Sequence, residues 1–350
     1  MIIHRLRGRW REELPSTAWR WLLLPAWLVF RPLARLRNLL FDLGWRRPHR
    51  LPVPVWSVGN LTAGGTGKSP LTRHLARWAI SHGLRPAIIS RGYRAGPGGA
   101  NDEARLVDEC PVILDPDRIA GGRRALAAGA TCLILDDGFQ HRRLHRDLDL
   151  VLIDATRPWG DEHGRAGATL PLGYLREGRA ALARAAALVL TRAALVPPDR
   201  LARLQGELAR YARPLIRVED RQARLRALGA TTTATATVGE LAGRAVVLVS
   251  GLGNPLGFEG AAGIHGWLVR ASLRYPDHHH YDAEDVATIV AAARQYDAVV
   301  VMTGKDAVKL VTLVPPAEAA RMRVLEVDSA IRAEDQAALD QLLLATLAPR

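Results

Sequence analysis

The stretch PVWSVGNLTAGGTGKSP, residues 54–70, decides the fold that this sequence predicts. An apolar, strand-like run leads into a glycine-rich loop, and Pro70 suits the first turn of a helix, where its missing N–H costs nothing. Apolar side chains then recur at helical spacing, at Leu71, Leu75, Trp78 and Ala79. Strand, loop and helix in this order are typical of a site that holds a nucleotide's phosphates. The sequence therefore predicts binding of ATP or GTP.

The residues of the loop have the chemistry that phosphates require. The glycines allow backbone N–H groups to converge on an anion, Lys68 offers a positive charge to the outer phosphates, and Ser69 offers a hydroxyl to magnesium. Thr62 replaces the first glycine of the strict pattern, but the Gly-Lys-Ser end is intact. The alternative is a glycine-rich turn with a chance lysine. The predicted nucleotide-binding residues are Thr62, Ala63, Gly64, Gly65, Thr66, Gly67, Lys68 and Ser69.

Composition indicates a globular protein of two domains. A chain of 350 residues with 48% hydrophobic content can bury a substantial core. Cys110 and Cys132 are the only cysteines, which is too few for a disulfide framework or a zinc cluster, so reduced thiols in a cytosolic compartment are expected.

The net charge of +13 is concentrated at the N-terminus. Residues 1–50 contain eleven arginines and three acids, a balance of 11 − 3 = +8, together with five of the nine tryptophans. Arginine and tryptophan around the apolar run 22–30 favour a helix lying in an anionic membrane interface. The run is too short to span a bilayer, which needs roughly 20 residues. A helical hairpin packed on the protein body is the alternative. No basic stripe with interleaved aromatics lies elsewhere, so no nucleic-acid partner is predicted.

Apolar runs alternate with helical stretches after the loop, which predicts an α/β fold. The runs are typical of a doubly wound, mainly parallel, P-loop NTPase-like sheet with ligands at the carboxyl ends of its strands. A second, smaller α/β domain is expected to follow a threonine-rich linker at 231–238. The predicted domains are an N-terminal membrane-associating segment, a phosphate-binding P-loop domain and a second α/β domain, at 1–50, 51–225 and 226–350. The predicted strands are 86–90, 111–114, 131–136, 148–154, 187–191, 245–250, 298–303 and 323–327.

Charged side chains follow two of the predicted strands. Asp136 and Asp137 end the run 131–136, where one carboxylate can reach magnesium and the other can orient a nucleophile or a metal-bound water. Paired acids at a strand end can instead form a helix cap. Arg91 ends the run 86–90 and is suited to a phosphate or a polar substrate, with a solvated surface charge as the alternative.

Two further clusters lie on predicted loops. The first is Asp102 with Glu103, and the second is the run of histidines at 278–280. Adjacent histidines on an extended loop point different ways, which disfavours a metal site. A single histidine that carries a proton together with a carboxylate fits better, because imidazole titrates near neutrality. An ordinary surface loop is the alternative.

From about Arg37 to Leu310 the chain resembles the tetraacyldisaccharide 4'-kinases of lipid A synthesis. The resemblance rests on separated motifs that occur in the family's order. They are residues 58–70, Ser90-Arg-Gly-Tyr93, Asp102-Glu103, Asp136-Asp-Gly-Phe-Gln-His141, Leu175-Arg-Glu177, Asp277-His278 and Thr303-Gly-Lys-Asp-Ala-Val-Lys-Leu310. Asn101, Ser69 and the loop at 159–176 depart from the usual pattern.

The resemblance implies transfer of the γ-phosphate of ATP, with Mg²⁺, to the 4'-hydroxyl of an acylated glucosamine disaccharide. It places the enzyme at the cytoplasmic face of the bacterial inner membrane, with no obligate protein partner. A P-loop nucleotide-dependent switch or metallochaperone, with the histidines as its metal handle, is the alternative function. The implied catalytic residues are Asp102, His278, Lys68 and Asp137, the implied metal ligands are Ser69, Asp136 and Glu103, and the implied substrate contacts are Arg91, His141 and Arg176.

Overall fold

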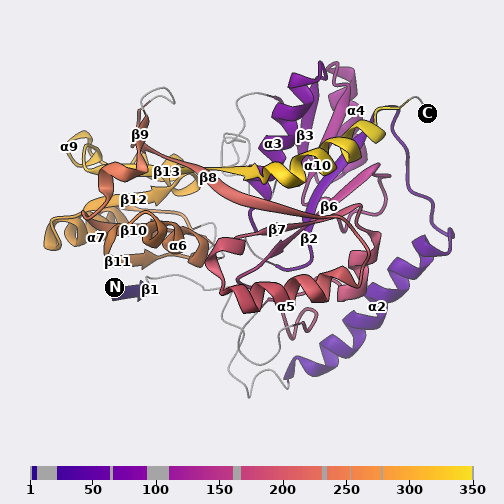
Figure 1. Ribbon diagram of the computed structural model, residues 1–350, viewed down its shortest axis with the longest axis horizontal. Helices are drawn as coiled ribbons and strands as arrows, with labels where there is room; N and C mark the ends of the chain where they lie inside the picture. Colours follow the sequence, from indigo (N-terminus) through magenta and orange to yellow (C-terminus); the bar gives the residue numbers. More distant parts are fainter. Residues whose placement is uncertain are drawn as a thin grey trace. The chain divides into compact units, whose positions relative to one another are not determined.

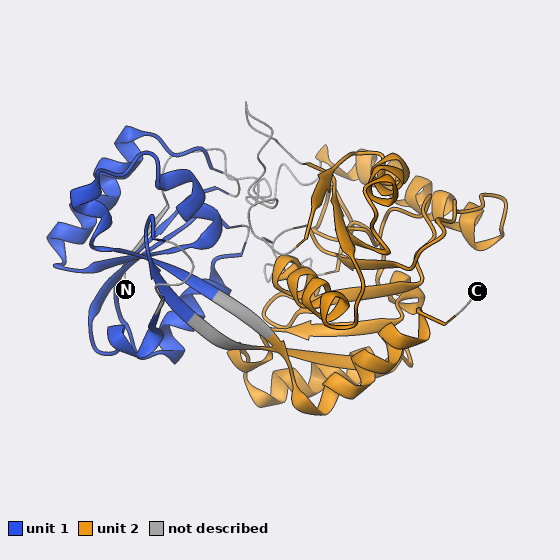
Figure 2. Cartoon of the chain, turned by 90° about the horizontal axis from the view of Figure 1, so that it is seen from above, with its two compact units in different colours: residues 1–13, 220–328 blue, residues 14–219, 329–350 orange. Residues whose placement is uncertain are grey.

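The computed structural model describes residues 2–5, 22–63, 66–92, 110–160, 167–230, 235–252, 254–276 and 279–348. The chain forms two compact units, which Figure 2 shows in different colours. Unit 1 comprises residues 1–13 and 220–328, and unit 2 comprises residues 14–219 and 329–350. The chain passes between the two units along the strands β8 (Leu215–Ala227) and β13 (Met322–Ile331).

Unit 2 is built on a parallel sheet with the strand order β8-β7-β6-β2-β5-β3-β4 (Figure 1). The strands are β2 (Val55–Asn60), β3 (Pro86–Ser90), β4 (Val112–Leu114), β5 (Cys132–Asp136), β6 (Leu148–Asp154) and β7 (Ala187–Thr191). They confirm the strands predicted in this part of the chain. The helices are α2 (Leu24–Asp42), α3 (Lys68–Ser81), α4 (Arg118–Ala127), α5 (Pro198–Ala209) and α10 (Ala333–Ala345), with 3-10 turns at Arg179–Arg184 and Ala193–Leu195.

Both faces of this sheet are covered, as the apolar strands predict. Along β6, Leu150 and Leu152 join the core beneath α3 and α10. The intervening Val151 and Ile153 join a second core that includes Leu204 of α5. The predicted doubly wound α/β fold is therefore confirmed, and the carboxyl ends of its strands are available for a ligand.

The helix α10 returns to unit 2 from the far end of the sequence. Two buried indoles fix it, because Trp56 Nε1 donates to Thr346 Oγ1 over 2.8 Å and Trp78 Nε1 donates to Asp340 Oδ1 over 2.8 Å. At its start, the Arg217 guanidinium donates to both carboxylate oxygens of Asp335, over 2.8 and 2.9 Å.

Unit 1 has its own parallel sheet, with the order β1-β11-β10-β12-β13. Unit 1 contains the end of β8 and most of β13. Its other strands are β1 (Ile2–Arg5), β9 (Thr235–Thr237), β10 (Ala245–Ser250), β11 (Leu268–Arg274) and β12 (Val299–Thr303). Its helices are α6 (Leu256–Ile264), α7 (Ala283–Gln295), α8 (Gly304–Leu310) and α9 (Pro316–Ala319), with a 3-10 turn at Val238–Leu241. The strands predicted at 245–250, 298–303 and 323–327 are confirmed, whereas β1, β8, β9 and β11 are not among the predicted strands.

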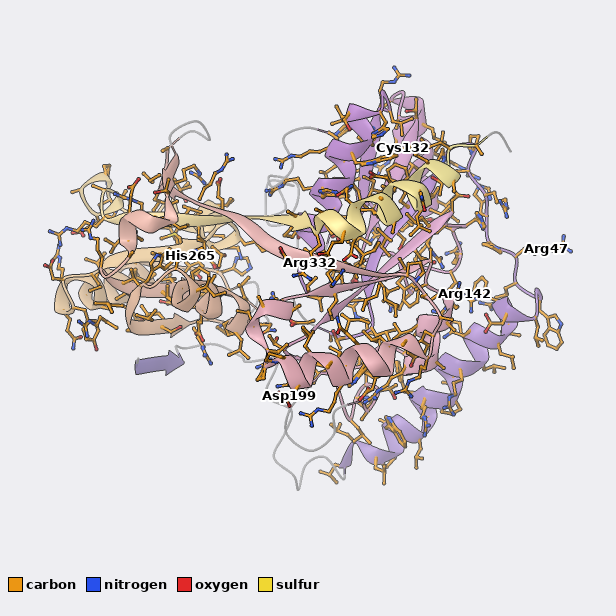
Figure 3. The ribbon with its side chains drawn as sticks, in the orientation of Figure 1. Arg47, Cys132, Arg142, Asp199, His265 and Arg332 are labelled. Carbon is orange, nitrogen blue, oxygen red and sulfur yellow. The ribbon has the colours of Figure 1, made fainter. Side chains whose placement is uncertain are left out.

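The helix α2 attaches to the rest of unit 2 by polar contacts, and none of its own residues is buried. Arg142, labelled in Figure 3, donates to the Asn38 carbonyl over 2.9 Å and to the Asp42 carboxylate over 2.7 Å. Apolar side chains remain exposed along the helix, including Val29 at 60%, Leu33 at 59% and Leu36 at 52%. No helix among the described residues is both long and apolar enough to cross a membrane.

Candidate active site

The glycine-rich loop at residues 61–67, which we call the phosphate loop, joins β2 to α3 at the carboxyl edge of the unit 2 sheet. Gly67 immediately precedes α3 with a φ of 87°, in the left-handed region that favours glycine. Lys68 and Ser69 form the first turn of the helix, whose unpaired N–H groups and dipole attract an anion. Of the predicted loop residues, Gly64 and Gly65 lie outside the described part of the chain.

The Lys68 side chain is directed back toward the end of β2. Its Nζ donates to Asn60 Oδ1 over 3.4 Å and lies 3.7 Å from Asp137 Oδ1. Asn60 is itself held in place, because its Nδ2 donates to the Thr62 carbonyl over 2.8 Å. The ammonium therefore lies between the phosphate loop and the acid that follows β5.

Asp137 lies between two cations. Arg176 donates to Asp137 Oδ2 over 2.6 Å, opposite the contact with Lys68. Burial raises the pKa of this carboxyl, but the charges of Lys68, Arg176 and Arg91 outweigh burial and lower the pKa to about 2. Asp137 is therefore ionised throughout the physiological range and balances part of the positive charge that a phosphate would meet.

Arg176 reaches this position because its segment runs antiparallel to the start of the phosphate loop. Ala63 N donates to the Tyr174 carbonyl over 2.8 Å, and Arg176 N donates to the Leu61 carbonyl over 2.8 Å. Thr62 pairs with Leu175 in an isolated antiparallel bridge. These backbone contacts bring together two predicted site residues, Arg176 and Asp137, that are 39 positions apart in the sequence.

The Asp-Asp-Gly-Phe-Gln-His turn packs directly against β2. Gly138 N donates to the Val58 carbonyl over 3.2 Å. A Cβ at Gly59 would lie 2.5 Å from Phe139 Cβ, and one at Gly138 would lie 2.8 Å from Ser57 Oγ of β2. Both glycines are therefore required for this close approach. Gln140 Nε2 completes it by donating to the Asn60 carbonyl over 2.9 Å.

Asp136 and Ser69 fit a magnesium ion by their chemistry. Asp136 is the last residue of β5 and lies beside Val58 of β2 in the strand register, with only 8% of its surface exposed. A carboxylate and a hydroxyl are the oxygen ligands that Mg²⁺ accepts while it keeps several waters. No group of three His, Cys, Asp or Glu residues suited to a metal occurs within the described ranges. The third predicted ligand, Glu103, lies outside them.

The other predicted site residues have different surroundings. Arg91 is exposed at the end of β3, and its charge reaches Asp137, whose pKa it helps to lower. Burial, followed by the charges of Arg118 and Arg146, lowers the pKa of His141 to about 4, so its imidazole is neutral at neutral pH. Asp102 and His278 lie outside the described residues.

Sequence reasoning missed four residues that support the site. Asn60 and Gln140 lay within quoted motifs, and their amides fix Lys68 and the β2 end. Arg118 donates to the carbonyls of Asp115 over 2.9 Å and Asp136 over 3.0 Å. Thr191 Oγ1 donates to the Thr66 carbonyl of the phosphate loop over 3.1 Å. Asn60 and Thr191 could have been predicted, because each is the last residue of a strand that leads to the ligand edge of the sheet. The sequence around Arg118 contains no pattern that indicates a role in the site.

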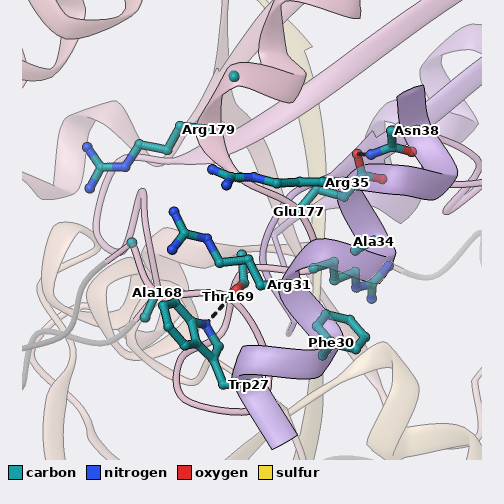
Figure 4. Close-up of a pocket in the computed structure, with 14 residues that line it drawn as sticks. Trp27, Phe30, Arg31, Ala34, Arg35, Asn38, Ala168, Thr169, Glu177 and Arg179 are labelled. Atoms are coloured by element: carbon teal, nitrogen blue, oxygen red, sulfur yellow. Dashed lines mark hydrogen bonds between the residues drawn. The ribbon is translucent and has the colours of Figure 1, made fainter. Parts of the chain in front are cut away.

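A cavity of about 420 Å³ lies between α2 and residues 167–180 (Figure 4). Arg176 lines it, so the cavity adjoins the Asp137 contact. Arg31, Arg35 and Arg179 also line it, beside the aromatic rings of Trp27 and Phe30. The Arg31 guanidinium lies 4.9 Å from the Trp27 ring centroid. The cavity thus combines positive charge with apolar surface.

The buried carboxylate of Glu177 ties α2 to the wall of this cavity. Its side chain is 2% exposed and accepts from Asn38 Nδ2 over 2.9 Å and from Arg184 over 2.7 Å. The Arg37 guanidinium donates to Glu177 Oε1 over a longer distance of 3.4 Å. Trp27 Nε1 adds a hydrogen bond of 2.9 Å to Thr169 Oγ1, drawn in Figure 4. Because Glu177 follows Arg176, the anchor of α2 and the partner of Asp137 are consecutive residues.

Comparison with known proteins agrees with this arrangement. The sequence pattern of the family described as LpxK, tetraacyldisaccharide-1-P 4'-kinase, matches residues 19–348. A tetraacyldisaccharide 4'-kinase from Anaeromyxobacter sp. (strain K) is 38% identical, over 97% of this chain and 96% of the relative. Another, from Syntrophotalea carbinolica, is 35% identical over 86% of this chain and 87% of the relative.

A solved structure of LpxK from Aquifex aeolicus in complex with ATP is also similar. The two chains superpose with a TM-score of 0.67 and share 27% identity, over 93% of this chain and 99% of the other. The resemblance that the separated motifs indicated is confirmed over nearly the whole sequence. This chain belongs to the tetraacyldisaccharide-1-P 4'-kinase family.

Proposed function

We propose that this protein transfers the γ-phosphate of ATP to the 4'-hydroxyl of a tetraacylated glucosamine disaccharide, a lipid A precursor. The contact of Asp137 with both Lys68 and Arg176 beside the phosphate loop carries the proposal. Phosphoryl transfer needs alignment and neutralised charge more than covalent help. Family membership favours the kinase over the nucleotide-dependent switch or metallochaperone.

The cavity beside Arg176 is suited to the polar head of the acceptor. Its arginines can pair with an anionic group, and Trp27 and Phe30 can contact sugar faces or the first acyl carbons. The family's description includes a 1-phosphate on the disaccharide. An acceptor bound here by that phosphate would have its 4'-hydroxyl at the opposite end of the disaccharide, which would extend along the cavity toward Arg176 and Asp137, where the transferred group is expected.

The residues of this chain divide the chemistry among them. Lys68 and Arg176 would bind the outer phosphates of ATP, while Asp136 and Ser69, with Glu103, would hold Mg²⁺. The ion would supply further neutralisation of phosphate charge. We assign removal of the acceptor's proton to Asp102, with His278 orienting or relaying that proton.

Substitution of Arg176 tests whether this residue contributes to phosphate transfer separately from Lys68. We expect Arg176→Gln to lower turnover about tenfold, since one charged donor is lost from a site that keeps the lysine. Wild-type Asp137 has a pKa of about 2, below its ordinary 3.8, so its ionised form contributes stability above about pH 4. That contribution is lost as the pH falls through 2. In the variant the folded-state pKa of Asp137 rises toward its ordinary value, so this contribution should be smaller and should be fully lost at a higher pH.

Thermal unfolding between pH 5 and 2, together with initial rates at neutral pH, checks this expectation. Arg203→Ala is a suitable control, because Arg203 forms an exposed 2.6 Å pair with Asp199 on α5. An Arg176→Gln variant with wild-type turnover would remove Arg176 from the phosphate site.

We further propose that α2 attaches the enzyme peripherally to the cytoplasmic face of the inner membrane. Its exposed leucines and valine can enter the interface, and its arginines can meet anionic lipid. Each arginine near such a surface contributes about 1 kcal/mol, a term that salt screens, whereas apolar burial persists. High salt alone should therefore release the protein incompletely.

A substitution on α2 tests the attachment. We expect the combined change Val29→Asn, Leu33→Asn and Leu36→Asn to reduce flotation with anionic liposomes and activity on vesicle-presented lipid, while ATP binding persists. Val311→Asn with Leu313→Asn is the matched control, because these side chains are also exposed, at 40% and 41%. Equal flotation of the α2 variant and the wild type would move lipid capture to another surface.

Transfer of radiolabelled phosphate from ATP to the purified lipid disaccharide tests the function itself. A labelled product that depends on the acceptor and retains the phosphate at the 4' position is the expected result. Hydrolysis of ATP without a labelled lipid would favour the nucleotide-dependent switch.

A further inference from the structure

A charged pair joins the ends of β6 and β7. Asp154 closes β6, and the guanidinium of Arg192, the residue after β7, donates to its carboxylate. The other carboxylate oxygen accepts from Thr156 N over 3.0 Å and from Thr156 Oγ1 over 2.6 Å. The Asp154 side chain is only 3% exposed. Asp154 therefore holds one nitrogen of the Arg192 guanidinium in place.

The end of β7, which Arg192 follows, lies directly beside the phosphate loop. Thr191, which precedes Arg192, donates to the Thr66 carbonyl over 3.1 Å, and a Cβ at Gly67 would lie 3.8 Å from Thr191 Cγ2. Arg192 itself has a φ of 57°, in the left-handed region that residues other than glycine usually avoid. Such backbone outliers are concentrated at ligand sites.

The strand order gives the direction in which a nucleotide extends from the loop. β2 lies between β6 and β5, and β7 lies beyond β6. Lys68 and Asp137 meet on the β5 side, so the reacting phosphate belongs there. The opposite end of an extended triphosphate then points over the carboxyl ends of β6 and β7, where ligands of such sheets bind. In ATP that end is the nucleoside.

We propose that Arg192, held by Asp154, is a specificity-determining residue that binds the nucleoside of the phosphate donor. A guanidinium held at one nitrogen by a carboxylate presents a flat cationic face, which stacks on a purine ring. The inference rests on the proposed use of ATP. It adds a recognition site for the base at the opposite end of the loop from the reacting phosphate.

Equilibrium binding in the absence of lipid tests this assignment. We expect Arg192→Ala to weaken ADP binding about tenfold, as measured by calorimetry, because a stacking contact is lost. Binding of inorganic tripolyphosphate, which has no nucleoside, should not change. Arg203→Ala is the matched control on α5, where its partner Asp199 is labelled in Figure 3. This control should bind both ligands as the wild type does.

A second variant keeps the test informative if Arg192→Ala does not fold. Arg192→Lys retains a charge for Asp154 but has no planar face, so ADP binding should weaken while tripolyphosphate binding is kept. Unchanged ADP affinity in a folded variant would overturn the proposal. An equal loss for both ligands would also overturn it, because the pair would then only support the loop. The assay needs no acceptor, so ADP binding through Arg192 without lipid phosphorylation would contradict the proposed function alone.

Discussion

Lys68→Ala should reduce phosphoryl transfer by roughly 10²-fold or more while the protein remains folded. The Lys68 ammonium lies 3.7 Å from Asp137 and 3.4 Å from the Asn60 amide oxygen, at the edge of the phosphate loop. In the proposed reaction, removing it would delete a charge that acts on the outer phosphates as negative charge is redistributed during transfer. Asp137 keeps its 2.6 Å contact with Arg176, so the surrounding turn retains a partner.

Initial rates with saturating ATP and acceptor measure this loss. Thermal unfolding at neutral pH distinguishes it from a loss of structure. Wild-type turnover in a folded Lys68→Ala protein would be incompatible with a phosphate site at this loop.

Asp102→Ala and His278→Ala should each lower turnover by about 10²-fold, the range expected for a group that transfers a proton. Neither change should greatly weaken ATP binding, because the phosphate loop is intact in both variants. Groups that act as one unit are not additive, so the double variant should be scarcely slower than the slower single variant.

The measurement is a double-mutant cycle on turnover, with calorimetric ATP binding alongside. Fully multiplicative losses would mean that Asp102 and His278 act independently. Asn101→Ala is a useful neighbour control for the first position, because it changes an adjacent side chain that has no assigned role in the chemistry.

Local sequence patterns predicted the part of the site that is made locally. β2, the loop that ends at Gly67 and α3 are contiguous in the sequence. The apolar strand, the glycines and the helical spacing of apolar residues were therefore enough to predict this strand-loop-helix arrangement. The contact of Arg176 with Asp137 depends instead on an antiparallel alignment of residues 61–63 with 174–176. That alignment is a property of the folded chain and has no signature in either segment alone.

The missed strands have physical reasons. β11 reads LVRASLR, and its first residues are exposed or half-buried, so it lacks the continuous apolar run of a central parallel strand. β8 reads LIRVEDRQARLRA, in which charged residues interrupt the alternation that indicates a strand. The sequence also did not predict that α10 belongs to unit 2. The position of α10 depends on partners that are distant in the sequence, such as Trp56 and Trp78.

The discontinuity of unit 2 has a consequence for biosynthesis. Residues 14–219 emerge from the ribosome long before residues 329–350, and residues 220–328 of unit 1 are synthesised between them. Until α10 arrives, the indole N–H groups of Trp56 and Trp78 lack their partners Thr346 and Asp340, and the core beside Leu339 is open. The nucleotide-binding unit therefore completes its core only after unit 1 has been made, and a nascent chain halted before residue 329 exposes an aggregation-prone apolar face.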